Sequence, residues 1–293
     1  MISVLKLLRP QNLLIIILTQ VLTLHFLLDS TIGDFNTILL ILSTVLIAGA
    51  GYIINDYFDI RIDRINKPQK MILVNKITRK QAILLHLLFN VIGVLIGFYL
   101  SLYFKMFSIA LIFIFIPALL FFYSAQFKRK YLIGNFIIAF FIAITVFLPA
   151  IIEYANEKNF LSFSSTIKFY VIFTYSIFAF LLTLIREVIK DIEDIDGDLK
   201  GGCRTFPIVS GIKKAKVFII WTIFIVLILT SIILYYLNFE SLLLPLYIIF
   251  VIKIPLIFLI ILIVRADKKA DFSKASLLTK TIMLIGILSM ILV

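Results

Sequence analysis

The chain has 293 residues, of which 62% are hydrophobic and 15% charged, and its mean hydropathy is +1.15. These proportions exclude an ordinary soluble domain, which carries a larger charged share, and they indicate an integral membrane protein. The formal net charge of +12 would suit a nucleic-acid partner, but its distribution along the chain favours a membrane surface.

Nine apolar runs are each long enough to cross the hydrocarbon core of a bilayer, which takes about 20 helical residues. They predict helices, because lipid leaves no partner for open backbone groups and the alternating pattern of a barrel strand is absent. The first run has no small-residue cleavage site and is not a signal peptide. The predicted fold is all-α, a bundle of nine transmembrane helices that forms a single domain over residues 1–293. The runs cover approximately 11–28, 36–58, 82–103, 106–127, 131–152, 167–187, 215–237, 242–264 and 274–292.

The basic residues gather in alternate loops between these runs. By the positive-inside rule we expect the N-terminus in the cytoplasm and the C-terminus outside, with the protein in the cell membrane. The basic excess then reflects topology and contact with anionic lipid heads, and no nucleic-acid partner is expected. The basic side includes Lys6, Arg9 and the loops 61–80, 128–130, 186–216 and 265–274, while the opposite loops hold Lys105, Lys158 and Lys168.

Two aspartate triads stand at the cytoplasmic ends of the second and sixth predicted spans. At i, i+3 and i+7, each triad falls within about 60° on one face of a helix. The identical spacing at equivalent ends suggests an internally duplicated bundle with two carboxylate faces across one cavity. The triads are Asp56, Asp59 and Asp63 in "NDYFDIRID", and Asp191, Asp194 and Asp198 in "DIEDIDGD".

A cation is expected to compensate these acids, because like charges on one helix face repel and are costly near a membrane. A calcium loop is excluded, since aligning its glycine on Gly197 puts Ile192 and Cys203 at ligand positions. Cys203 is the only cysteine, which also excludes an intramolecular disulfide and a thiolate cluster. Mg²⁺ fits better, because it binds a few carboxylates and completes its shell with water and phosphate oxygens. The alternative is that each triad is a solvated helix end paired with nearby lysines and arginines.

With these motifs the sequence resembles the UbiA-type intramembrane prenyltransferase superfamily over nearly its whole length. The family motif NDxxDxxxD matches at 55–63, and the second motif, DxxDxxxD, matches at 191–198. The segment "YSAQFK" looks like the family's YSxxxK element, at Tyr123, Ser124 and Lys128.

A further stretch departs from the family pattern. "NKPQKM" resembles NKPxRP at Asn66, Lys67 and Pro68, but Lys70 and Met71 replace the usual Arg-Pro. Lysine keeps the charge and loses the bidentate fork of arginine, which puts the geometry of this loop in doubt.

The resemblance implies transfer of a prenyl chain from an allylic prenyl diphosphate to an acceptor, with Mg²⁺ as cofactor. It implies that the six aspartates are metal ligands and that Asn55, Lys67 and Lys128 meet the diphosphate. Tyr123 and Lys128 are the predicted catalytic residues, and Lys128 is expected to stabilise the charge that grows on the leaving diphosphate. The alternative is that Lys128, together with its basic neighbours, only anchors the cytoplasmic end of its span.

Three charged residues flank the second triad. Arg186 and Lys190 are candidates to meet phosphate oxygens, and the alternative is that they pair with Glu193 or Asp194. Glu187 lies one turn before Asp191 and is expected to support the metal site through a second shell of contacts.

The acceptor is less determined than the reaction. "RPQN" near the start and "REVIKDIEDIDGDLKGG" followed by "TFPIVSG" look most like the digeranylgeranylglyceryl phosphate synthase subfamily, in which geranylgeranylglyceryl phosphate is the lipid acceptor. An aromatic quinone precursor is the alternative acceptor, and a transporter is the alternative outside enzymes. Prenyl chain length and oligomeric state stay open.

Overall fold

The structure is a computed structural model that describes residues 2–66, 73, 76–157, 166–236 and 241–293. Across these ranges the chain forms helices and no strand, so the all-α prediction is confirmed. Nine helical segments of the described chain are long and apolar enough to cross a membrane, and they correspond one to one to the predicted runs. These segments are Pro10–Leu27, Asp34–Asn66, Arg79–Tyr103, Phe107–Ala125, Ile133–Glu157, Ile167–Glu193, Ile212–Tyr235, Leu243–Arg265 and Lys269–Leu292.

The chain divides into two compact units, each assembled from separate stretches. The first comprises Met1–Lys128 and Ile144–Phe173, and the second comprises Arg129–Ala143 and Thr174–Val293. Helices α6 and α8 each contribute residues to both units. The single-domain prediction stays a prediction.

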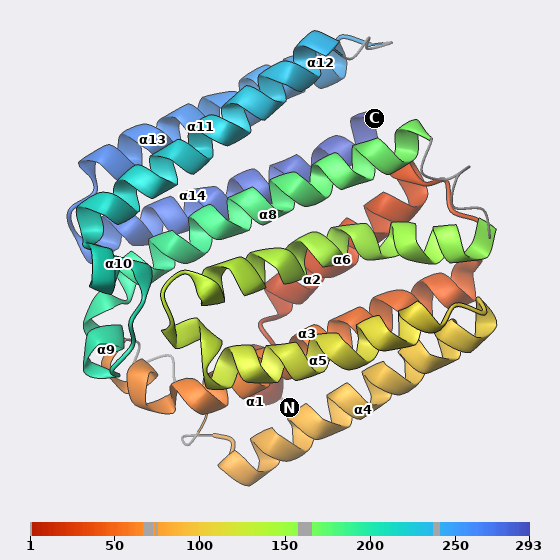
Figure 1. The fold of residues 1–293 in the computed structure, drawn as a ribbon, viewed down its shortest axis with the longest axis horizontal. Coiled ribbons are helices and arrows are strands. Elements are labelled where there is room, and N and C mark those ends of the chain that lie inside the picture. Colours follow the sequence, from red (N-terminus) through yellow and green to blue (C-terminus); the bar gives the residue numbers. More distant parts are fainter. Residues whose placement is uncertain (1, 67–72, 74–75, 158–165, 237–240) are drawn as a thin grey trace. The chain divides into compact units, whose positions relative to one another are not determined.

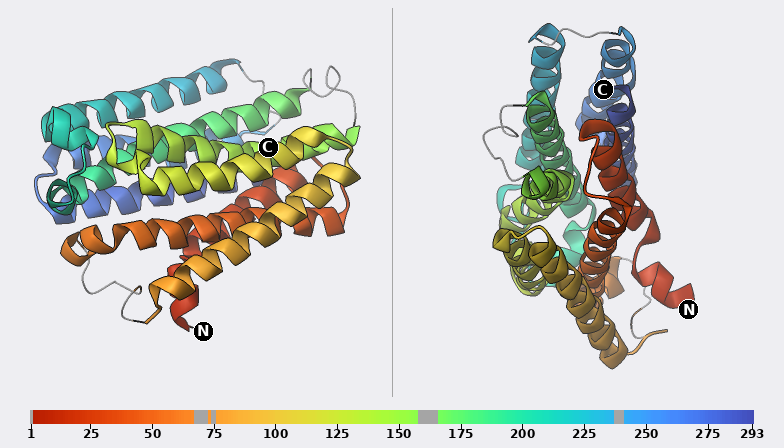
Figure 2. Two further views of the ribbon diagram at one scale, coloured as in Figure 1. Left: turned by 60° about the horizontal axis from the view of Figure 1, so that its bottom comes forward. Right: turned by 90° about the vertical axis from the view of Figure 1, so that its right-hand side faces the viewer.

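The first unit is held together by close packing of α3, α4 and α5, which lie side by side in Figures 1 and 2. A Cβ atom built on Gly97 of α4 would lie 2.2 Å from the Phe113 ring of α5, and one on Gly93 would lie 2.8 Å from Ile47 of α3. Glycine therefore lets the backbones approach, as is common between membrane helices. The unit contains α1 (Ile2–Leu7), α2 (Pro10–Leu22), the π-helical turn η1 (Thr23–Leu27), α3 (Asp34–Asn66), α4 (Arg79–Tyr103), α5 (Phe107–Ala125) and parts of α6 (Ile133–Glu157) and α8 (Ile167–Glu193).

Helix α3 runs to Asn66, beyond the predicted end of its span at 58, so the first triad lies on one continuous helix. Two apolar side chains explain the extension: Ile60 and Ile62 alternate with the acids and are both buried. Helix α4 begins at Arg79 because Thr78 and Gln81 form a capping box, in which each side chain accepts a hydrogen bond from the other's backbone N–H.

The second unit has its core between α8, α11 and α13, where Ile189, Ile219 and Leu259 are fully buried. Pro255 opens the last part of the eighth span, just after the π-helical segment η4. A proline cannot donate to the preceding turn, and a local π-turn absorbs that defect. The unit contains α9 (Ile195–Lys200), α10 (Phe206–Ser210), α11 (Ile212–Tyr236), α12 (Leu243–Tyr247), η4 (Ile248–Lys253), α13 (Ile254–Arg265), α14 (Lys269–Leu288) and the 3₁₀ turn η5 (Ser289–Leu292).

The second triad differs from the expectation of one uninterrupted helix. Helix α8 ends at Glu193, Asp194 has φ −100° and ψ 9°, and α9 begins at Ile195. Asp191 therefore lies on α8 and Asp198 on α9. The break falls on an aspartate because its short side chain competes for nearby backbone groups and favours helix ends over interiors.

We expect Gly97→Ala to destabilise the first unit, because the new methyl group would overlap the Phe113 ring. Overpacking of this kind typically costs about 1–3 kcal/mol. The measurement is the thermal unfolding midpoint in detergent. Gly286→Ala on α14 is the matched control, since its Cβ would meet no heavy atom within 4 Å. Equal midpoints for the two variants would contradict the close approach of α4 and α5.

Candidate functional site

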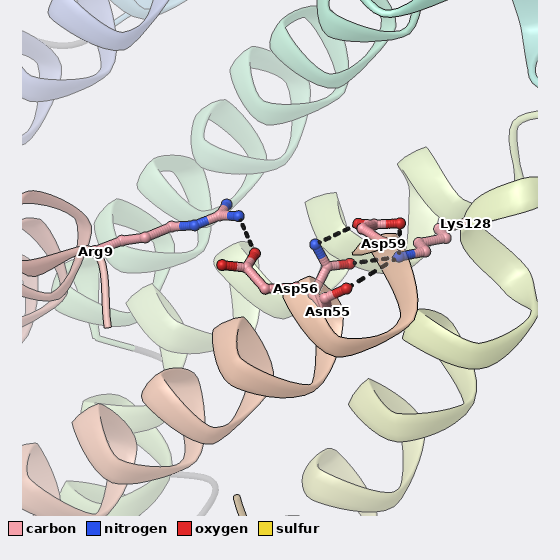
Figure 3. A network of polar contacts seen from close by, with 5 residues as sticks. All are labelled: Arg9, Asn55, Asp56, Asp59 and Lys128. Carbon is pink, nitrogen blue, oxygen red and sulfur yellow. Dashed lines mark hydrogen bonds and ion pairs between the residues drawn. The ribbon is translucent and has the colours of Figure 1, made fainter. Parts of the chain in front are cut away.

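A lysine and an asparagine hold one carboxylate of the first triad (Figure 3). Lys128 Nζ donates to Asp59 Oδ1 at 2.5 Å and to Asn55 Oδ1 at 3.1 Å, and Asn55 Nδ2 donates to Asp59 Oδ2 at 2.9 Å. Asn55 and Asp59 are four residues apart on α3, and Lys128 lies in the 3₁₀ turn η3 (Phe127–Arg129). The side chains of Lys128 and Asp59 are only 11% and 17% exposed, so water screens this pair weakly. Three predicted site residues are thus brought together.

An arginine holds the neighbouring carboxylate. Arg9 Nη2 donates to Asp56 Oδ1 at 2.6 Å, and its guanidinium lies 5.2 Å from the centre of the Tyr52 ring. Partial burial alone would lower the pKa of Arg9, but the nearby Asp56 carboxylate, with Tyr52 and Asp63, outweighs it and raises that pKa. The guanidinium therefore stays charged.

The backbone of Arg9 is strained in the position that makes this contact. Its φ of 51° and ψ of 63° lie in the left-handed region, just before Pro10 begins α2. Such a conformation costs a non-glycine residue about 1–3 kcal/mol and is found where surrounding contacts fix it. Here the contact that fixes it is the ion pair with Asp56.

The other residues predicted around the first triad fall in three places. Asp63 is half-buried on the last turns of α3, and Tyr123 is half-buried near the end of α5. Lys67 lies outside the described residues, as do Pro68, Lys70 and Met71 of the "NKPQKM" stretch. Their predicted roles stay predictions.

The second triad is held by different groups. Asn135 Nδ2, on α6, donates to Asp191 Oδ2 at 2.8 Å, and Asn135 is buried. Lys269 Nζ lies 3.9 Å from Asp194 Oδ1. The backbone oxygen of Asp198 accepts from the N–H of Cys203 at 2.9 Å, which closes the turn after α9. The contact to Asp191 comes from a neutral amide, so it brings no opposite charge to that carboxylate.

Arg186 and Lys190 both bond to one glutamate. Lys190 Nζ donates to Glu187 Oε1 at 2.7 Å and Arg186 Nη1 donates to the same oxygen at 3.3 Å. The predicted contacts of Arg186 and Lys190 with phosphate stay predictions.

The carboxylates fit Mg²⁺ that arrives with a phosphate group. Within the described ranges, no three acidic, histidine or cysteine side chains lie close enough to enclose a metal ion by themselves. A closed protein cage is not what Mg²⁺ requires, because it keeps several waters and takes phosphate oxygens. The carboxylates of the two triads are oxygen ligands of the kind that would supply one or two of its bonds.

Two residues of the site were not predicted from the sequence. Arg9 was noted only as a basic residue and as part of "RPQN", a stretch that could have identified Arg9 as a site residue. Asn135 gave no signal, because a single asparagine near the start of an apolar run has no recognisable spacing to the triads.

Comparison with known proteins gives matches over most of the chain. The UbiA prenyltransferase family matches residues 16–285. A digeranylgeranylglyceryl phosphate synthase from Methanosphaera stadtmanae is 34% identical over 290 residues, which are 97% of this chain and 96% of that protein. Another, from Methanothermobacter thermautotrophicus, is 30% identical over 280 residues, 94% of this chain and 90% of that protein.

Solved structures share the fold. A UbiA homologue from Aeropyrum pernix K1 gives a TM-score of 0.74 at 17% identity, covering 97% of this chain and 98% of its own. A UbiA homologue from Archaeoglobus fulgidus, bound to GPP and Mg²⁺, gives 0.62 at 17% identity, covering 99% of this chain and 100% of its own.

We expect Asn135→Ala to weaken Mg²⁺ binding, because Asp191 would lose the donor that orients it. Removing such a supporting contact typically costs about 10- to 100-fold in metal affinity. The Mg²⁺ concentration that gives half-maximal diphosphate release measures the effect. Asn156→Ala on the same helix is the control, since Asn156 bonds to the hydroxyl of Thr31. A half-maximal concentration that stays at the wild-type value in Asn135→Ala would contradict a supporting role.

Proposed function

The chain belongs to the UbiA prenyltransferase family, and from that premise we propose that it transfers a geranylgeranyl group to geranylgeranylglyceryl phosphate. It is a multi-pass membrane protein and a prenyltransferase, as its motifs predict. The acceptor is supported by relatives that carry the name digeranylgeranylglyceryl phosphate synthase at 30–34% identity over nearly the whole chain.

The observation that carries the proposal is the bonded group of Lys128, Asn55 and Asp59. It holds an ammonium with three donors beside a carboxylate at the end of an apolar helix. That pairing suits a diphosphate and its metal ion, because the carboxylate can bind the metal ion and the lysine can donate hydrogen bonds to the phosphate oxygens. Mg²⁺, when bound, neutralises charge on the leaving diphosphate.

The reaction exchanges one carbon–oxygen bond for another. The bond between C1 of the prenyl chain and the diphosphate oxygen breaks, and its electron pair leaves with the diphosphate. The free hydroxyl oxygen of the acceptor bonds to C1, and the hydroxyl proton passes to an oxygen of the leaving diphosphate. Lys128 stabilises the leaving group, and we propose Tyr123 as a second catalytic residue. The apolar helices exclude water from the allylic cation.

We propose that the six triad aspartates supply the carboxylates that bind Mg²⁺. The residues proposed to bind the diphosphate oxygens are Asn55, Lys67, Lys128, Arg186 and Lys190. Arg9 joins the first group as a positioning residue, because it fixes the orientation of Asp56.

We also propose that the protein lies in the cell membrane with a cytoplasmic N-terminus and an external C-terminus. The support is the excess of lysine and arginine in alternate loops. Protease cleavage of a C-terminal tag in intact cells checks this orientation. A tag that resists cleavage would indicate that the C-terminus lies in the cytoplasm.

We expect Asp59→Ala and Asp194→Ala each to lower Mg²⁺-dependent transfer by roughly 10²–10³-fold, because each removes a carboxylate from the metal and diphosphate site. Diphosphate release and product formation measure transfer, and the unfolding midpoint confirms a folded bundle. Asp267→Ala is the matched control, since its side chain is 90% exposed. Full activity in either triad variant would contradict a mechanism that needs both motifs.

For the acceptor, we expect membranes given labelled geranylgeranyl diphosphate to label geranylgeranylglyceryl phosphate. The comparison acceptors are 4-hydroxybenzoate, homogentisate and a naphthoate, offered at equal concentration. Labelling of an aromatic acid with none of the glycerol phosphate lipid would replace the proposed acceptor by the quinone-precursor alternative.

A further inference from the structure

A fully buried amide lies deep inside the first span. Gln20, on α2, donates from Nε2 to Thr44 Oγ1 of α3 at 3.1 Å. The same nitrogen lies 3.5 Å from the backbone oxygen of Thr145, on α6. Thr44 gives its own hydroxyl proton to the backbone oxygen of Leu40. Both partners of the amide nitrogen are therefore acceptors, which fixes the orientation of the amide.

The oxygen of this amide has no hydrogen-bond partner within the described part of the chain. Gln20 Oε1 is thus a buried acceptor, and such groups are costly unless a donor meets them. A water molecule can be that donor, but a hydrocarbon chain cannot, because it has no N–H or O–H group. A lipid chain that filled the space beside this amide would leave the acceptor unsatisfied. The amide and the Thr44 hydroxyl therefore oppose an apolar ligand at this depth.

Thr44 lies on the face of α3 that carries the groups proposed to meet the diphosphate and its metal ion. Ala48, Asn55 and Asp59 follow it at offsets of 4, 11 and 15 residues, which puts all four within about 60° on one face. Thr44 and Ala48 are both half-buried, so neighbouring helices do not cover this face completely. A prenyl chain held through its diphosphate at Asn55 and Asp59 would run along this face, because it avoids the aqueous end of the helix.

The distance to Thr44 matches one chain length. At 1.5 Å per residue, Thr44 lies about 16 Å from Asn55 and about 22 Å from Asp59 along α3. An extended chain gains about 1.2 Å per bond, as a polypeptide does, so the main chain of about 16 carbons in a geranylgeranyl group spans about 18 Å. A farnesyl group spans about 13 Å, and a geranylfarnesyl group, one isoprene unit longer, about 23 Å. Of the three, the geranylgeranyl group ends between these limits.

We propose that Gln20 and Thr44 form a polar boundary that ends the path of the prenyl chain and sets the chain length of the donor at geranylgeranyl. The proposal rests on the proposed function and assigns the choice of its prenyl donor to two residues. Arg9 and Asp56 join α2 to α3 at the diphosphate end, and the polar boundary joins the same two helices deeper in the bundle. The spacing between the two ends is therefore fixed by the geometry of these helices.

The test measures binding of prenyl thiolodiphosphates, in which sulfur replaces the bridging oxygen, with Mg²⁺ and without an acceptor. The farnesyl, geranylgeranyl and geranylfarnesyl compounds are compared in detergent, so no turnover is needed. We expect the wild type to bind the geranylgeranyl compound most tightly and the geranylfarnesyl compound roughly 10- to 200-fold more weakly, the range for misfitted methylene groups. Thr44→Val and Gln20→Leu are each expected to remove most of that difference, because an apolar side chain accepts the longer chain.

Two further variants complete the test. Ala48→Phe is expected to shift the preference to the farnesyl compound, because its ring would occupy the same face one helical turn nearer the diphosphate. Thr222→Val on α11 is the matched control. The Thr222 hydroxyl is also buried in a span and bonds to the carbonyl four residues before it, at 2.9 Å. This control is expected to keep the wild-type preference.

A wild type that binds the geranylfarnesyl or the farnesyl compound as tightly as the geranylgeranyl compound overturns the boundary. A folded Thr44→Val or Ala48→Phe variant, judged by its unfolding midpoint, that keeps the wild-type preference overturns it too. A preference that depends on Thr44, in a protein that makes no product from geranylgeranylglyceryl phosphate, supports the boundary and removes the proposed acceptor. Product formation with a preference that Thr44→Val leaves unchanged removes the boundary alone.

Discussion

Compensation of charge at the ends of apolar helices is the constraint on which the rest of this structure depends. Carboxylates near a bilayer have little water to solvate them, so each must meet a cation or a hydrogen-bond donor. Asp56 meets Arg9, and Asp59 meets Lys128 and Asn55. These bonds tie the start of α2 and the turn after α5 to α3, so the groups that suit a metal and a diphosphate also fix the architecture around them.

The two triads share their spacing and differ in their compensation. In the first, Asp56 and Asp59 form close ion pairs with Arg9 and Lys128. At the second, Asp191 accepts from the neutral amide of Asn135, and Lys269 stays 3.9 Å from Asp194. The contact that holds Asp191 is thus uncharged, whereas Asp56 and Asp59 are held by cations. A duplicated motif has thus been given unequal electrostatic surroundings.

Much of the fold could be predicted because membrane helices are local features. Twenty apolar residues specify a span whatever surrounds them, since lipid forces the backbone to bond within the segment. Tertiary packing explains one difference from the prediction, because burial of Ile60 and Ile62 extends α3. The other has a local cause, since the aspartate at 194 favours the helix end that separates α8 from α9.

The sequence by itself determined the nine spans, the two acidic motifs and the reaction class, because hydropathy and i, i+3, i+7 spacing are properties of neighbouring residues. Only the tertiary structure decided which groups hold the acids. Arg9 and Asp56 are 47 positions apart, and Asn135 and Asp191 are 56 apart. Contacts over such distances arise when helices pack side by side, and no local pattern encodes which side chains then meet.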